Sequence, residues 1–149
     1  LVVLDSILNR ITQNRAKGRN TFIFIDEIYL LFQHEYSANF LFTLWKRVRK
    51  YGAYCTGITQ NVDDLLQSHT ARTMLANSEF LIMLNQASTD RIELAKLLNI
   101  SDLQLSYITN VDAGHGLIKV GSSLVPFANK FPKNTKLYKL MTTKPGEGA

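Results

Sequence analysis

The chain has 149 residues, of which 46% are hydrophobic and 19% charged, a composition typical of a globular protein with one domain and one core. No apolar run reaches the roughly 20 residues that a membrane-spanning helix needs. The net charge of +5 favours an anionic partner, such as a nucleotide, a nucleic acid or an acidic membrane surface, without choosing among them.

The chain opens with an amphipathic pattern that ends before the polar turn at residues 15–20. Apolar side chains recur at helical spacing at Leu1, Val2, Leu4, Ile7, Leu8 and Ile11. We therefore expect a first helix that packs on the core. Because the sequence begins without a Met or a secretory signal, we also expect it to be a segment of a longer protein.

A short apolar run, Thr21–Ile25, ends in two adjacent carboxylates, Asp26 and Glu27. Five β-favouring residues without polar alternation indicate a strand of a parallel sheet, buried on both faces. In open α/β sheets, ligands bind at the carboxyl ends of the strands. An acid at this place in P-loop nucleotide hydrolases holds hydrated magnesium, and a second acid orients the attacking water. Alternatively, both carboxylates simply begin a helix, where they complement its dipole.

The next expected element is a helix at residues 38–51, with a short helical turn and a loop before it. One arc of about 140° carries its large apolar side chains, Phe40, Leu41, Leu44, Trp45, Val48 and Tyr51. This arc is expected to pack on the sheet. Arg49 projects to the opposite side together with Lys46 and Lys50, and Arg47 lies at the margin. Such a basic face is usually just solvated.

A second strand is expected at residues 53–60, ending in Thr59 and Gln60. If the two strands are parallel neighbours, Gln60 lies beside the acid pair. Its amide could then hydrogen-bond a γ-phosphate or the attacking water. Alternatively, Gln60 is a polar strand end that leads into the next helix.

The remaining pattern alternates helices and strands up to a C-terminal hairpin. We expect helices at 65–78, 88–98 and 101–109, the last with a capping box, and a wholly apolar interior strand at 80–84. Residues 114–120 and 124–127 indicate a β-hairpin whose second arm, containing Pro126, lies at an edge. The chain becomes basic after Lys130, and residues 142–149 are expected to be disordered.

Several other kinds of site are disfavoured by the sequence. The three histidines are far apart and lack neighbouring ligands at zinc spacing. No G-x-S-x-G motif occurs. The single cysteine, Cys55, excludes an internal disulfide, which suits a reducing compartment, and its place in a buried strand argues against a nucleophile.

The motifs occur in an order that resembles a known family. The segments TFIFIDEIYLL, LWKRVRKYGAYCTGITQNVDDLL, ARTMLANSEFLIMLNQASTDRIELAKLL and GHGLIKVG resemble the C-terminal half of the conjugative-transfer ATPases of type IV secretion systems. These TraC- and TraE-like proteins belong to the HerA and FtsK branch of RecA-like P-loop ATPases. The resemblance implies an α/β fold: a partial RecA-like P-loop core, mainly a parallel sheet flanked by helices, with a C-terminal β-hairpin. The ATPase portion would span residues 1–132, and residues 133–149 would form a basic, flexible tail.

The resemblance also implies roles for individual residues. Asp26 would hold the magnesium shell and Glu27 would activate water, as the Walker B pair, and Gln60 would sense the γ-phosphate. Arg49 matches an R-x-x-G pattern whose arginine reaches the nucleotide of the neighbouring subunit, with Arg47 as the alternative. The cofactors implied are ATP and Mg²⁺.

One departure from the family is the absence of G-x-x-x-x-G-K-[ST], the loop that cradles the phosphates. The family has this loop upstream, after a strand that lies between the second and third strands expected here. Without that strand the sheet lacks a central member, and its uncovered edges favour repacking or self-association. We therefore expect the isolated segment to bind ATP weakly and to hydrolyse none.

Three functions are compatible with these features. The first is a secretion ATPase, hexameric and recruited to channel components at the inner face of the membrane, on the cytoplasmic side. The second is a DNA-translocating pump of the same branch, which the net charge supports. The third is a non-catalytic interaction module.

Overall fold

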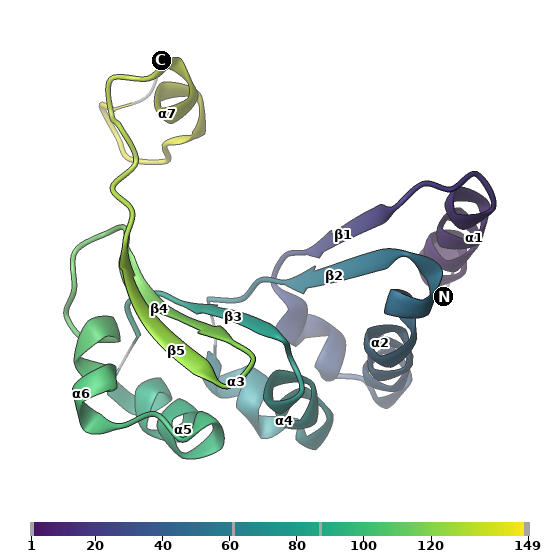
Figure 1. Ribbon diagram of the computed structural model, residues 1–149, viewed down its shortest axis with the longest axis horizontal. Helices are drawn as coiled ribbons and strands as arrows, with labels where there is room; N and C mark the ends of the chain where they lie inside the picture. Colours follow the sequence, from purple (N-terminus) through teal and green to yellow (C-terminus); the bar gives the residue numbers. More distant parts are fainter. Residues whose placement is uncertain (1, 61, 87, 148–149) are drawn as a thin grey trace. The chain divides into compact units, whose positions relative to one another are not determined.

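The structure, a computed structural model, describes residues 2–60, 62–86 and 88–147 (Figure 1). The chain divides into two compact units, residues 1–77 and 78–149. The expectation of one core was therefore wrong. The resemblance offers a physical reason, because it places a strand outside this chain between the second and third strands. Within the described ranges, no helix has the length and hydropathy needed to cross a bilayer.

The first unit combines helices with a two-stranded parallel sheet. Its elements are α1 (Val2–Ala16), β1 (Thr21–Ile25), the 3-10 helix η1 (Ile28–Phe32), α2 (Glu35–Arg47), the 3-10 helix η2 (Val48–Tyr51), β2 (Ala53–Gly57), α3 (Val62–Gln67) and α4 (His69–Ala76). β1 pairs with β2 in parallel, from Thr21 opposite Ala53 to Ile25 opposite Gly57. The parallel pairing is confirmed, but β2 ends three residues before Gln60.

Two buried clusters hold the helices of the first unit against one face of its sheet. One cluster joins α1, α2, η2 and β2 through Ile11, Leu44, Val48 and Ala53. The other joins η1, α2, α3 and α4 through Ile28, Leu41, Leu65, Ala71 and Met74. Burying these side chains removes apolar surface from water, which stabilises the fold by about 25 cal/mol per Å² buried.

The opposite face of this sheet is open to solvent. Phe22 and Phe24 are 64% and 68% exposed, and Phe22 stacks on Tyr54 with 5.1 Å between ring centroids. The prediction that β1 is buried on both faces was therefore wrong for this chain. The apolar residues alternate between the helix-covered face and the open face, so an uninterrupted apolar run did not mean that both faces are covered here.

Two helices of the first unit differ from their predicted bounds. α2 begins at Glu35, three residues before the expected start, and ends at Arg47, where the 3-10 helix η2 continues the chain to Tyr51. The helix expected at 65–78 is instead divided into α3 and α4. Ser68 interrupts it, because its hydroxyl accepts a hydrogen bond from the Ala71 N–H at 3.3 Å and caps α4.

The second unit contains an antiparallel sheet covered by short helices. Its elements are β3 (Phe80–Met83), α5 (Ser88–Leu98), α6 (Asp102–Leu105), the 3-10 helix η3 (Ser106–Ile108), β4 (His115–Val120), β5 (Ser123–Ala128) and α7 (Lys136–Met141). The sheet order is β3-β4-β5, so the hairpin and the edge position of Pro126 are confirmed. The capping box is also present, since Ser101 and Gln104 bond each other's backbone N–H groups.

The second unit corrects two predictions about the sheet. β3 lies at an edge, antiparallel to β4, and not in the interior, and Phe80 and Ile82 are more than half exposed. Instead of one mainly parallel sheet, the described residues form a small parallel sheet, β1-β2, and a separate antiparallel sheet, β3-β4-β5. The helix α7 lies in the segment expected to be a flexible tail. The boundary at residue 132 and that flexibility stay predictions.

Candidate functional site

The acid pair lies at the carboxyl end of β1, where the chain turns sharply into η1. Glu27 adopts the left-handed conformation, with φ 47° and ψ 48°, and the Asp26 carboxylate accepts a hydrogen bond from the Glu27 N–H at 3.0 Å. This conformation costs a residue other than glycine about 1–2 kcal/mol. Glutamate is thus held here at a cost to stability, a feature that recurs at functional sites.

One oxygen of the Glu27 carboxylate is buried although the residue as a whole is only half-buried. In the described part of the chain, Glu27 Oε2 has no hydrogen-bond partner. A buried polar atom in this state costs about 1–3 kcal/mol. Asp26, by contrast, is exposed. A ligand or water that donates to Glu27 Oε2 would therefore stabilise the site.

Gln60 is brought to the same edge of the sheet by contacts just beyond the strand ends. The Ile58 N–H donates to Ile25 O at 2.8 Å, and the Ile28 N–H donates to Ile58 O at 2.9 Å. These bonds hold the segments that follow β1 and β2 side by side. Gln60 is exposed two residues later. The structure thus gathers Asp26, Glu27 and Gln60 at one edge, as the sequence predicted, while their chemical roles stay predictions.

Gly57 shapes the turn after the acid pair, a role that was not predicted from the sequence. A Cβ at this position would lie 2.6 Å from Ile28 Cδ1, so the missing side chain makes room for the turn after the acid pair. Ile28 is 5% exposed and anchors that turn in the cluster with Leu41 and Leu65. A glycine inside a strand pattern is the signal that could have indicated this close approach.

The two candidate arginines lie at the opposite edge of the sheet. Arg47 and Arg49 are exposed at the end of α2 and in η2, directly before β2 begins at Ala53. The acid pair follows β1 at its far end. Because the two strands run parallel and in register, four residue steps, roughly 13 Å, separate these edges. Within one chain, the structure therefore does not bring the arginines to the acid pair.

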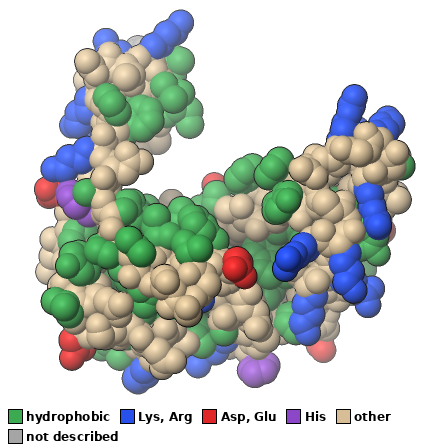
Figure 2. Space-filling model, viewed as in Figure 1, with side chains coloured by type: hydrophobic (Ala, Val, Ile, Leu, Met, Phe, Trp, Pro, Cys, Tyr) green, Lys and Arg blue, Asp and Glu red, His purple; other side chains and the backbone are tan. Residues whose placement is uncertain are grey.

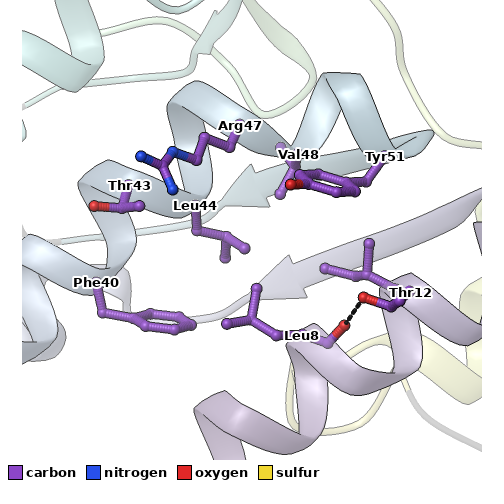
Figure 3. A pocket seen from close by; sticks show the side chains of 9 residues that line it. Leu8, Thr12, Phe40, Thr43, Leu44, Arg47, Val48 and Tyr51 are labelled. Atoms are coloured by element: carbon purple, nitrogen blue, oxygen red, sulfur yellow. Dashed lines mark hydrogen bonds between the residues drawn. The ribbon is translucent and has the colours of Figure 1, made fainter.

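A cavity of about 310 Å³ between α1 and the α2–η2 segment also lies away from the acid pair (Figure 3). Its lining comprises Leu8, Ile11, Thr12, Phe40, Thr43, Leu44, Arg47, Val48 and Tyr51. Figure 3 shows Leu8 and Leu44 facing each other across it, with the Arg47 guanidinium extending towards Thr43. This mainly apolar lining offers little to a phosphate group.

The residues at the acid edge fit part of what ATP and Mg²⁺ require. Magnesium is usually bound by one or two carboxylates together with waters and substrate phosphates. Asp26 and Glu27 suit that role, whereas no group of three or more His, Cys, Asp or Glu side chains within the described ranges could form an all-protein metal site. The phosphate-cradling loop is absent from the sequence. The acid edge thus offers carboxylates of the kind that magnesium prefers, while the described residues lack the loop that would hold the phosphates.

Cys55 shows no sign of nucleophilic activation. Burial raises the pKa of its thiol to about 11, so the thiol is protonated at neutral pH.

Parallel strands that carry two carboxylates and an amide to one edge are an arrangement found in α/β proteins that bind nucleotides. Its residues 1–119 match the family model of the TraG P-loop domain, and the chain belongs to that family. Among solved structures, it is similar to VirB4 of Thermoanaerobacter pseudethanolicus, with 26% sequence identity and a TM-score of 0.77. The match covers 87% of this chain and 36% of that chain. No curated protein matches it.

These comparisons confirm the resemblance inferred from the motifs: the chain is a segment of an ATPase of the conjugative-transfer and type IV secretion class. The family implies nucleotide binding, with a metal ion as the usual companion.

Proposed function

We propose that this chain supplies the metal-binding and water-activating half of an ATP-hydrolysing site in a RecA-like motor that powers type IV secretion or conjugative transfer. The observation that carries the proposal is Glu27, held in a left-handed conformation at the end of β1 with a buried, unpartnered carboxylate oxygen. Membership of the TraG P-loop domain family supports it.

In this proposal each residue at the acid edge has a distinct role. Asp26 is the exposed carboxylate and orients the water shell of the magnesium ion. That ion, when bound, neutralises charge on the β- and γ-phosphates. Glu27 accepts a proton from the water that attacks the γ-phosphorus, while the bond to the ADP oxygen breaks. The Gln60 amide hydrogen-bonds the γ-phosphate or the attacking water.

The opposite edge of the sheet serves a neighbouring subunit in the same proposal. Arg49, or alternatively Arg47, stabilises the charge that develops on the phosphates bound next door. Support comes from the structure, because both arginines are exposed and separated from the acid pair of their own chain. The full-length protein then works as an oligomer, most simply a hexamer. Its partners are channel components at the inner face of the cell membrane.

ATP turnover tests the catalytic half of the proposal. The purified 149-residue chain should show no turnover, because it lacks the phosphate-cradling loop. The longer protein that joins this chain to such a loop should hydrolyse ATP, and Glu27→Gln should reduce its kcat by at least about 100-fold. Turnover by the 149-residue chain itself, lost on Glu27→Gln, would contradict the proposed division of the site.

Arg49→Ala and Arg47→Ala, compared in the longer protein, separate the two arginine candidates. The arginine that acts in trans should be needed for turnover at any protein concentration. Mixing its inactive variant with inactive Glu27→Gln protein should restore some activity, because one interface in such a mixture keeps both groups.

A DNA-translocating pump is the second candidate, favoured by the basic residues near the start of the sheet. Eight of them lie in two segments that contact each other, α1 with its following turn and the end of α2 with η2: Arg10, Arg15, Lys17, Arg19, Lys46, Arg47, Arg49 and Lys50. DNA-stimulated turnover with a steep dependence on salt would favour this function. Turnover indifferent to DNA would favour the secretion ATPase.

A further inference from the structure

The C-terminal segment, residues 130–147, combines lysines with apolar side chains outside the region that matches the family model, residues 1–119. Its basic residues are Lys130, Lys133, Lys136, Lys139 and Lys144. Its large apolar residues are Phe131, Leu137, Tyr138, Leu140 and Met141. Residues 142–147 were expected to be disordered, and α7 was not predicted. The structure therefore adds an organised element to this segment.

A small set of contacts gives the segment its shape. Thr135 caps α7 by accepting a hydrogen bond from the Tyr138 N–H at 3.2 Å. The Tyr138 ring stacks on Phe131 with 6.3 Å between centroids, and its hydroxyl donates to the Glu147 carboxylate. Glu147 also pairs with Lys133 at 3.0 Å. Tyr138 is thus the inward side chain around which the segment folds.

One side of α7, bordered by Tyr138, is apolar and open to solvent. Leu137, Leu140 and Met141 are 56%, 64% and 73% exposed. Their spacing of i, i+3 and i+4 places them on one arc of about 100°. Figure 2 shows hydrophobic side chains gathered on the part of the surface where Figure 1 places α7, with basic side chains beside them.

The charge of the segment is strongly one-sided. Glu147 is its single acid, and that acid is already paired with Lys133. On the helix, Lys136 borders the apolar arc next to Leu140 and Lys139 lies farther round on the same side, while Lys144 follows the helix. An exposed apolar arc edged by lysines complements a surface that is apolar inside and negatively charged at its boundary.

We propose that residues 130–147 bind an anionic phospholipid surface, with Leu137, Leu140 and Met141 entering the boundary between headgroups and acyl chains and the lysines contacting the headgroups. A nucleic acid fits less well, because a phosphate backbone offers nothing to three aliphatic side chains. This proposal rests on the membrane location proposed above and names residues 130–147 as the segment that contacts the membrane. It does not depend on ATP hydrolysis.

Vesicle co-sedimentation with the 149-residue chain tests the assignment. One set of vesicles contains phosphatidylcholine alone, and the other contains about 30 mol% phosphatidylglycerol to mimic an anionic membrane. Three variants are compared. L137S/L140S/M141S keeps the charge, K136Q/K139Q/K144Q keeps the apolar arc, and K17Q/R19Q/K50Q removes three exposed cations from the first unit as a matched control. Circular dichroism verifies that each variant is folded, and Trp45 fluorescence reports on the first unit in the control.

The chain should bind the anionic vesicles and not the neutral ones. Each lysine contributes about fivefold to such binding, so the three glutamines should weaken it by on the order of 100-fold. The serine variant should lose at least about tenfold, and the control should bind nearly as the original chain does, with at most a small nonspecific loss.

Two results would overturn the assignment. Failure of the chain to bind anionic vesicles would remove the segment as a membrane contact while leaving the ATPase proposal intact, since turnover tests that separately. Binding that both tail variants retain would place the contact elsewhere on the chain. If the chain binds duplex DNA and no vesicle, and K136Q/K139Q/K144Q loses that binding while K17Q/R19Q/K50Q keeps it, the segment recognises nucleic acid.

Discussion

Replacing Glu27 with glycine should stabilise the chain although it removes the proposed catalytic carboxylate. The left-handed backbone of Glu27 costs about 1–2 kcal/mol, a cost that glycine avoids. Removing the unpartnered Oε2 atom recovers about 1 kcal/mol or more. The greater conformational freedom of glycine in the unfolded chain offsets about 0.5–1 kcal/mol of this gain. The net gain in unfolding free energy is therefore about 1.5 kcal/mol.

Urea unfolding followed by the fluorescence of Trp45 measures this gain. Trp45 is the chain's single tryptophan, and it packs against the cluster that contains Ile28, next to the acid turn. With a urea slope of about 1.5 kcal/mol per molar, the midpoint should rise by about 1 M. Glu27→Ala removes the carboxylate but keeps a Cβ in the left-handed region, so its midpoint should lie below that of Glu27→Gly.

Asp26→Gly is the matched control, one residue earlier in the same turn. Asp26 does not have a positive φ, and its carboxylate accepts the Glu27 N–H. Glycine there should lower the midpoint by about 0.5 M, since it adds chain entropy and loses a hydrogen bond. If Glu27→Gly lowered the midpoint as much as Asp26→Gly does, Glu27 would not be strained and the main structural support for its catalytic role would be lost.

Three further predictions concern packing and titration. Leu41→Ala should lower the unfolding free energy by about 3 kcal/mol in urea, because Leu41 is 1% exposed within the Ile28 cluster; a loss below about 1 kcal/mol would contradict that packing. Gly116→Ala should abolish native circular dichroism or lower Tm by several degrees, since a Cβ there would lie 2.3 Å from Met83 O; an unchanged Tm would contradict the β3–β4 approach. Cys55 should react with iodoacetamide with a midpoint near pH 11 in the folded chain and near pH 9 in urea, because burial raises its pKa. Because the folded pKa is raised, the contribution of the Cys55 thiol to stability is complete below pH 9 and is lost as the pH rises through about 11. Equal reaction midpoints in the folded and unfolded chain would contradict the burial of Cys55.

The predictions that succeeded were those set by local sequence. Thr21–Ile25 forms β1, Ser101 begins its capping box, and residues 114–127 form a hairpin with Pro126 at the edge. Each of these depends on side chains a few residues apart. Ser68 shows the limit of such patterns, because the apolar spacing continues through it while its hydroxyl begins a new helix.

The predictions that failed depend on what covers a strand. The uninterrupted apolar runs of β1 and β3 predicted interior strands, yet Phe24 and Ile82 are largely exposed. An uninterrupted apolar run indicates that both faces of a strand should be covered. It does not indicate whether the covering element lies within this chain. The acid edge was predictable from strand ends, whereas the left-handed Glu27 and the space left by Gly57 depend on tertiary contacts with Ile28 and Ile58.

The separation of acids and arginines on opposite edges of one sheet has a consequence for symmetry. A two-fold contact through the acid edge would set carboxylate against carboxylate and leave both arginines facing water. A head-to-tail contact joins unlike edges, and repetition of the same contact either closes a circle or continues as a filament. With the trans arginine proposed above, each chain would supply the acids of one site and the arginine of the next, so a cyclic assembly would have as many complete sites as subunits.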